Sequence, residues 1–232
     1  MPWSGERHRV YIAVLDALRE RTGCALCRLE AAGAHRYLDG VLYERATDSE
    51  YRSHLVRAGG FCPRHAHQLA DLPDCLGVAM LYDGLLRGYL DSLTRLARGG
   101  PDRFRWLKNI AARWTGLRPA PPCPACVIQS DQRDRYAAMI ADGWSDMALH
   151  DAMEGASPLC AAHFHGVARK MNTRDDRVAL AFIEAGKIAA LLDQLEEFLD
   201  HQRMERLNES WGPERDAWIR AVEVMTGVRG IA

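Results

Sequence analysis

The sequence predicts an all-α protein, a helical bundle made of two tandem duplicated helical units that each carry a Cys3His metal site. Apolar residues recur at helical spacing along most of the chain, and alternating β-branched runs are nearly absent. Cys-x2-Cys and Cys-x2-His motifs occur twice in the same order. The chain has 232 residues, 48% apolar and 26% charged, as expected for a globular protein whose core needs no crosslinks to fold.

Apolar stripes predict the helices in order along the chain. They cover residues 10–18, with Ser4 as a candidate N-cap, then 29–42, 76–97, 176–207 and a short final helix near 214–226. Clusters of Gly, Pro and capping residues separate them, at 59–60, 72–75, 98–102, 117–124, 154–158 and 209–214. The proline cluster at 117–124 marks the main internal boundary.

An internal repeat divides the chain at that boundary. Cys24, Cys27, Arg36 and Tyr37 correspond to Cys123, Cys126, Arg135 and Tyr136 at an offset of 99, and Cys62, His65 and His67 correspond to Cys160, His163 and His165 at 98. Such matching predicts a duplication whose halves pack against each other. We expect a single compact domain with a first repeat and N-terminal helix at 1–97, a basic connector at 98–122, a second repeat at 123–207 and a C-terminal helix at 208–232 packed on the bundle.

The repeated motifs predict two metal sites. Three thiolates and one imidazole are ligands that zinc prefers, and four of them complete a tetrahedral shell. Pro63 and Pro124 each follow a cysteine, and proline favours the first position of a helix. Cys62 and Cys123 are therefore predicted N-caps, where the helix dipole stabilises thiolate. The predicted ligands of two zinc ions per chain are Cys24, Cys27, Cys62, His65, Cys123, Cys126, Cys160 and His163.

Several alternatives stay open at this point. Each site can close within one repeat, which is simpler and which we favour, or across the repeats, with Cys24 and Cys27 joining Cys160 and His163. An iron–sulfur cluster is the alternative to zinc. His67 lies five residues after Cys62, about 140° around a helix, so it is expected to point away from the ion, and His165 likewise. Cys75 has no counterpart in the second repeat and is expected to be buried or half-buried.

The net charge and the lack of a recognisable targeting segment argue against some classes of protein. A net charge of −1 argues against a nucleic-acid-binding protein. Residues 103–118 are basic and aromatic, and we interpret them as a connector helix lying on the bundle. The alternative is a helix that binds a partner or an anionic surface, including nucleic acid. No secretory signal and no apolar stretch of membrane-spanning length is recognisable, so we expect the cytoplasm and reduced thiols.

The metal sites and the missing catalytic motifs argue further against an enzyme. Four filled ligand positions leave no place for water or substrate, and no phosphate-binding loop or hydrolase motif is present. We expect an interaction or scaffold protein with architectural metals and a protein partner. The alternative function is that of an iron–sulfur or dithiol redox protein, for electron transfer or oxidant sensing.

The same blocks resemble an uncharacterised bacterial family, a domain of unknown function. The matching stretches are "CALC" at 24–27, "GFCPRH" at 60–65, "CPAC" at 123–126, "LCAAH" at 159–163 and "AWIRAVEVMTG" at 217–227. "CALC" departs from a proline-containing pair, and "SPLC" replaces "GFC", but neither change removes a ligand. The resemblance implies metal binding on a helical fold and brings no established activity.

Overall fold

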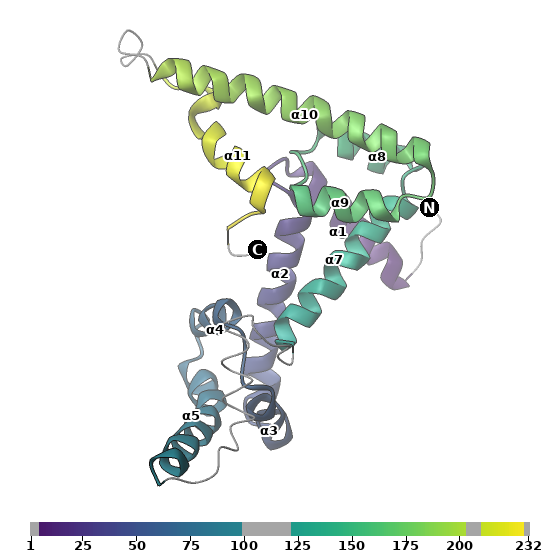
Figure 1. Ribbon diagram of the computed structural model, residues 1–232. Coiled ribbons are helices and arrows are strands. Elements are labelled where there is room, and N and C mark those ends of the chain that lie inside the picture. Colours follow the sequence, from purple (N-terminus) through teal and green to yellow (C-terminus); the bar gives the residue numbers. More distant parts are fainter. Residues whose placement is uncertain (1–4, 99–121, 203–209, 230–232) are drawn as a thin grey trace. The chain divides into compact units, whose positions relative to one another are not determined.

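The computed structural model describes residues 5–98, 122–202 and 210–229, and every regular element in those ranges is helical (Figure 1). The predicted all-helical fold class is confirmed. The chain forms two compact units, which we call the terminal unit (Met1–Ala31 with Asp131–Ala232) and the central unit (Ala32–Ser130). The boundaries between them fall inside two helices, α2 (Ala25–Gly40) and α7 (Pro124–Asp142).

The terminal unit contains the first turns of α2, the end of α7 and most of the remaining helices. These are α1 (Gly5–Arg19), α8 (Met147–Gly155), α9 (Ala161–Lys170), α10 (Arg174–His201), the 3₁₀ turn η2 (Pro213–Asp216) and α11 (Ala217–Thr226). α1 packs on α8, and α11 contacts both α9 and α10. Leu18, Leu26, Ile140, Leu149 and Leu180 are among its fully buried core residues.

The central unit contains the rest of α2, the start of α7 and four further elements. These are the π-helical turn η1 (Val41–Arg45), α3 (Ser49–Ala58), α4 (Pro63–Ala70) and α5 (Cys75–Ala97). α5 contacts α3, α4 and η1, and the core gathers around Leu38, Leu55, Leu69 and Leu81. Apolar burial of this kind, at about 25 cal/mol per Å², holds short helices together better than their own propensity does.

Matched capping residues begin corresponding helices in the two units. The Asp48 carboxylate caps α3, accepting from Glu50 N at 2.8 Å and Tyr51 N at 3.2 Å. The Asp146 carboxylate caps α8 by accepting from Leu149 N at 3.1 Å. The two aspartates differ by 98 positions, the same offset that relates Cys62 to Cys160. The duplication itself stays a prediction, as do the domain boundaries drawn from the sequence.

The helices predicted from apolar stripes correspond to α1, α2 with η1, α5, α10 and η2 with α11. Three predictions fall on residues outside the described ranges: the Ser4 cap, the 103–118 connector and the last residues of the 176–207 stretch. Among the helices that the structure describes, none combines the length and apolar content needed to span a membrane.

Candidate metal centres

Each of the four cysteine motifs opens a helix. Cys62 and Cys160 are the N-cap residues of α4 and α9, and α2 and α7 begin directly after Cys24 and Cys123. In all four motifs the carbonyl of the first cysteine accepts the hydrogen bond from the amide four residues later, at 2.8–3.2 Å. A motif placed this way puts its first and fourth residues on one face of the helix start, so both side chains can reach one point.

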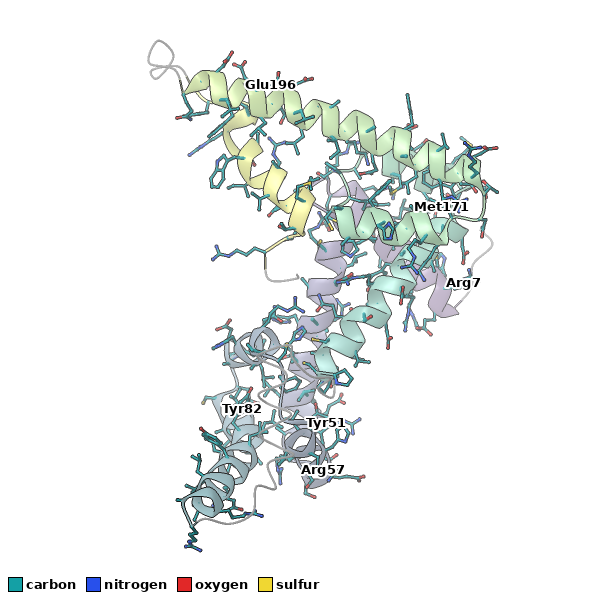
Figure 2. The ribbon with its side chains drawn as sticks, in the orientation of Figure 1. Arg7, Tyr51, Arg57, Tyr82, Met171 and Glu196 are labelled. Carbon is teal, nitrogen blue, oxygen red and sulfur yellow. The ribbon has the colours of Figure 1, made fainter. Side chains whose placement is uncertain are left out.

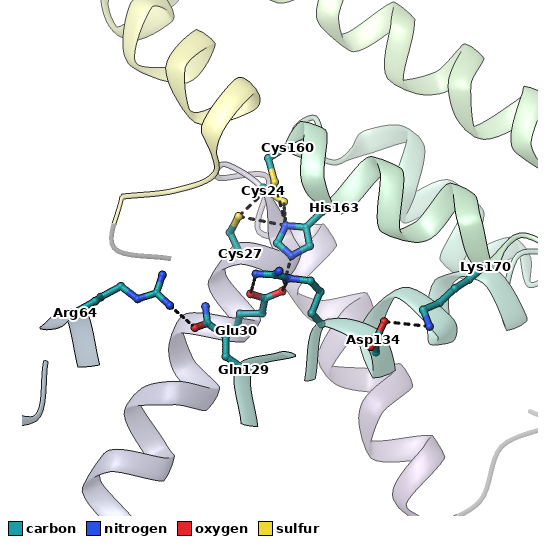
Figure 3. Close-up of polar contacts among 10 residues, drawn as sticks. Cys24, Cys27, Glu30, Arg64, Gln129, Asp134, Cys160, His163 and Lys170 are labelled. Carbon is teal, nitrogen blue, oxygen red and sulfur yellow. Dashed lines mark hydrogen bonds and ion pairs between the residues drawn. The ribbon is translucent and has the colours of Figure 1, made fainter. Parts of the chain in front are cut away.

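The first cluster, called the Cys24 cluster, consists of Cys24, Cys27, Cys160 and His163, all four buried. Nδ1 of His163 lies 3.4 Å from Sγ of Cys24, 3.3 Å from Sγ of Cys27 and 3.1 Å from Sγ of Cys160. The sulfurs of Cys27 and Cys160 are 3.7 Å apart. The cluster lies wholly within the terminal unit and joins the starts of α2 and α9 (Figure 3).

The second cluster, called the Cys62 cluster, consists of Cys62, His65, Cys123 and Cys126. Nδ1 of His65 lies 3.2 Å from Sγ of Cys62, 3.6 Å from Sγ of Cys123 and 3.3 Å from Sγ of Cys126. The sulfurs of Cys62 and Cys126 are 3.7 Å apart, and these two cysteines are half-buried. This cluster lies within the central unit and joins the starts of α4 and α7.

The grouping corrects one prediction. We favoured sites closed within a single repeat, with Cys24 and Cys27 joining Cys62 and His65, and this is wrong. Each cluster takes its Cys-x2-Cys pair from one predicted repeat and its Cys-x2-His pair from the other. The physical reason is that both members of each group belong to the same packed core: Cys24 and Cys160 to one, Cys123 and Cys62 to the other.

The imidazole of His163 is held by a buried carboxylate. Glu30, which is 0% exposed, lies one turn after Cys27 on α2, and its Oε1 accepts from Nε2 of His163 at 2.5 Å. Arg133 of α7 donates to both oxygens of Glu30, at 2.9 and 3.0 Å (Figure 3). Burial acts to raise the pKa of Glu30, but the bonds to His163 and Arg133 bring it below its usual value. The carboxylate therefore fixes the tautomer that leaves Nδ1 of His163 facing the sulfurs.

The corresponding position beside the Cys62 cluster holds an amide. Gln129 lies 99 residues after Glu30 and three after Cys126, and it is also buried. Nη2 of Arg64 donates to its Oε1 at 2.9 Å. A neutral amide in this place gives less negative charge beside the cluster than a carboxylate does, so the two clusters differ in their surroundings.

The thiols and imidazoles of each cluster shift one another's pKa values. Burial lowers the pKa of His163, but its hydrogen bonds to Cys160, Cys24 and Glu30 outweigh burial and raise it to about 11. The pKa of His65 rises to about 9 because its bonds to Cys123 and Cys62 likewise outweigh burial. The pKa values of the N-cap cysteines Cys62 and Cys160 are strongly lowered, first by hydrogen bonds from neighbouring thiols. Thiolate, the protonation state in which cysteine binds metals, is favoured at these two positions. The pKa values of Cys27 and Cys126 are raised instead, first by hydrogen bonds to the neighbouring thiols of the same cluster.

The ligand atoms have the separations that one tetrahedral ion requires. Zinc binds sulfur at about 2.3 Å and imidazole nitrogen at about 2.0–2.1 Å, which places two ligand sulfurs about 3.8 Å apart and sulfur about 3.6 Å from nitrogen. The observed distances are 3.7 Å between sulfurs and 3.1–3.6 Å between sulfur and nitrogen. All seven cysteines are free, and a disulfide needs about 2.05 Å. Both clusters can therefore hold a metal ion.

Three other candidate residues lie outside both clusters. His67 and His165 are exposed, on the sides of α4 and α9 away from His65 and His163. Cys75 was expected to be buried or half-buried, and this is wrong: it is exposed. It is the first residue of α5, and its side chain lies on the exposed side of the helix start, although Leu72 just before it is in the core.

A third group of potential ligands, His150, Asp151 and Glu154, lies on the surface of α8. The two carboxylates are exposed, and the His150–Glu154 contact of 3.7 Å is an ordinary i,i+4 pair. Nothing about this group indicates an ion.

Sequence reasoning missed Glu30 and Gln129. Both lie three residues after the second cysteine of a Cys-x2-Cys pair, on the same helix face as that cysteine, and the repeat offset of 99 relates them. A long polar residue three positions after each Cys-x2-Cys pair was the sequence signal that could have identified them.

Comparison with known proteins gives a family and no activity. The sequence model of a family of unknown function, DUF6062, matches residues 7–230, nearly the whole chain. The resemblance noted from the motifs is thereby confirmed. No curated protein and no solved structure matches the chain.

Proposed function

This chain is a member of the DUF6062 family, whose function is unknown, and we propose that it binds two zinc ions that hold its helices in place. One ion occupies the Cys24 cluster and the other the Cys62 cluster. The zinc-clamped helical body then serves as an interaction or scaffold protein in the cytoplasm, with a protein partner.

The size of the two ligand clusters is the observation that carries the proposal. Sulfurs 3.7 Å apart fit ligands of a single ion. In an iron–sulfur cluster, thiolates bound to different irons are separated by iron and sulfide atoms, whereas all ligand atoms of each group here lie within 4.8 Å of one another. Three thiolates and one neutral imidazole also match a common structural zinc set. These features favour zinc over the iron–sulfur alternative.

An architectural role follows from the closed ligand set. Four protein ligands leave no coordination position for water or substrate, so the ions are not expected to catalyse hydrolysis. Each ion instead links distant segments: Cys27 and Cys160 are 133 residues apart, and Cys62 and Cys126 are 64 apart. Structural zinc contributes about 10–16 kcal/mol in small peptides, comparable to the whole stability of a domain.

Metal analysis of protein purified without oxygen tests the proposal directly. We expect a colourless protein containing two zinc ions per chain, which loses helical structure when a strong chelator removes them. Reductant alone should change neither the metal content nor the helicity. A brown protein containing iron and sulfide, or a protein that keeps its fold and two disulfides after oxidation, would instead establish the redox alternative.

A further inference from the structure

The helix α10 carries an apolar row along its outer face. One side of the helix is directed into the core through residues such as Leu180 and Leu191. On the opposite side, every position in the row is exposed. The helix is labelled α10 in Figure 1, and Glu196, one residue of the row, is labelled in Figure 2. The row consists of Val178, Phe182, Ala185, Ala189, Leu192, Glu196 and Leu199.

The spacing of this row indicates a helical partner. Its steps alternate strictly between four and three residues from Val178 to Leu199, as in the seam of a coiled coil. Phe182 is 80% exposed and Leu199 is 61% exposed. Contiguous apolar surface of this kind marks an interaction site on most proteins. A straight seam of about 32 Å fits another helix laid along it.

We propose that α10 pairs with α10 of a second copy of this chain, antiparallel, about a two-fold axis near residue 187. The inference goes beyond the zinc sites, because it rests on the surface of α10 and on an apolar groove beside it. In this register the residue numbers of two facing residues add up to 374. Phe182 therefore lies opposite Leu192 of the other copy, and Ala185 lies opposite Ala189.

The distribution of side-chain size supports a second copy over an unrelated helix. Small residues occupy the middle of the row, at Ala185 and Ala189, and large ones occupy both flanks, at Phe182 and Leu192. An antiparallel two-fold pair matches small with small at the crossing and large with large on either side. Where the contact residues are small, the axes of two packed helices can come to about 8 Å, the lower end of the usual range of about 8–10 Å. A two-fold interface must be complementary to itself in this way.

Charge supports the antiparallel direction. Glu196 is the one charged residue of the row, and in a parallel pair it would face Glu196 of the other copy. In the antiparallel pair it lies opposite Val178 of the other copy, one helical turn from that copy's Arg174. Arg174 begins α10 and is exposed, so it places a positive charge within about one turn of that carboxylate.

A groove beside the row supplies the receptor for Phe182. It has a volume of about 470 Å³ and runs between α9, α10 and α11. Its lining is almost entirely apolar and includes Phe164, Ala189, Leu192 and Met225. Because Phe182 of the other copy lies opposite Leu192, its ring is directed to this groove. A protruding aromatic side chain and an apolar groove on one surface are the two halves of an isologous contact.

Sedimentation equilibrium of the full-length, metal-loaded protein tests the pairing. We expect a dimer for the wild type and a rise of about 30-fold or more in the dimer Kd for Phe182→Asp, as for loss of a central anchor. Leu86→Asp is the matched control, because Leu86 is 64% exposed on α5 in the central unit, and it should leave the dimer Kd unchanged. Circular dichroism and metal content should be the same for all three proteins.

Charge reversal tests the direction of pairing. Arg174→Glu and Glu196→Arg should each weaken the dimer, and the double variant should recover it. A wild-type monomer at high concentration, or a dimer unaffected by Phe182→Asp, would overturn the proposal. So would a wild-type monomer that binds a different protein through α10. Metal analysis of the same samples keeps this result separate from the zinc proposal, because a dimer without zinc or a zinc-loaded monomer would contradict only one of them.

Discussion

The Cys24 and Cys62 clusters use the same four ligand types at the same spacing, yet their surroundings differ. All four residues of the Cys24 cluster are buried, whereas Cys62 and Cys126 are half-buried. His163 is backed by the carboxylate of Glu30, whereas the matching position near the Cys62 cluster is the amide of Gln129. A motif that occurs twice can therefore duplicate the ligands of a metal site without duplicating the surroundings that set the site's metal affinity and accessibility.

Further contacts reinforce the enclosure of the Cys24 cluster. The Glu184 carboxylate of α10 accepts from Leu159 N at 2.8 Å and fixes the chain directly before Cys160. After α11, Gly227 adopts a φ of 88°, and a Cβ there would lie 3.6 Å from Sγ of Cys27. The backbone of Val228 then bonds to the Cys27 sulfur. We therefore expect the Cys24 cluster to hold its ion more tightly and to exchange it more slowly than the Cys62 cluster.

The largest expected effect comes from removing one ligand of each cluster. Cys160→Ser should lose one zinc per chain and the amide protection of the terminal unit, and Cys126→Ser should do the same for the central unit. Each variant leaves buried thiolates without their ion, so we expect several kcal/mol of destabilisation. Hydrogen exchange with mass spectrometry, combined with metal analysis, locates the loss. Cys75→Ser is the control and should change neither, because Cys75 is exposed outside both clusters.

The next largest effect is expected from the two buried polar residues that lie one turn after the Cys-x2-Cys pairs. Glu30→Leu should weaken zinc binding at the Cys24 cluster about 10–100-fold, as loss of a carboxylate behind a histidine ligand does elsewhere. Gln129→Leu should weaken the Cys62 cluster less, since an amide contributes less charge. Competition with a chelator of known affinity measures both. Equal losses in the two variants would mean that the charge of Glu30 does not distinguish the clusters.

The Cys62 cluster is more exposed than the Cys24 cluster, so we expect the two metal ions to be released at different rates. With excess chelator at constant pH, we expect one zinc to leave quickly from the half-buried Cys62 cluster and the second to leave slowly. Thiol alkylation followed by peptide mapping identifies which cysteines react first, with Cys75 as the internal standard for an exposed thiol. Release in one phase, or early modification of Cys24 and Cys27, would contradict the difference in enclosure.

The smallest expected effect compares the two matched caps. Asp48→Ala and Asp146→Ala should each cost about 1 kcal/mol in the free energy of unfolding of their own unit, because each removes a helix N-cap. Asp146→Ala should cost somewhat more, since its carboxylate also accepts from the Tyr11 hydroxyl at 3.0 Å. Thermal unfolding at saturating zinc measures both. Asp48→Asn and Asp146→Asn are the controls, and they should retain most of the capping contribution.

Much of the fold could be read from the sequence because it is encoded locally. The apolar stripes of α1, α5 and α10 repeat at helical spacing, and Pro63 correctly marks Cys62 as an N-cap. The shorter helices α3, α4, α8 and α9 have about three turns or fewer, so periodicity gives them weak signals. Cys75 was misplaced because nothing in its neighbours shows on which side of the first turn of α5 it lies.

The eight candidate ligands follow from the four motifs, because each motif needs only the geometry of one helix start to bring two side chains together. Which motifs form a cluster together depends on which helix starts pack in the same core. The cysteines that meet there are 64 or 133 residues apart in the chain, so the grouping is visible in the folded protein and not in the motifs. The hydrogen bonds of Glu30 to His163 and Arg133 are likewise known only from the folded protein. Contacts of this kind arise from packing between distant segments, and no local pattern specifies them.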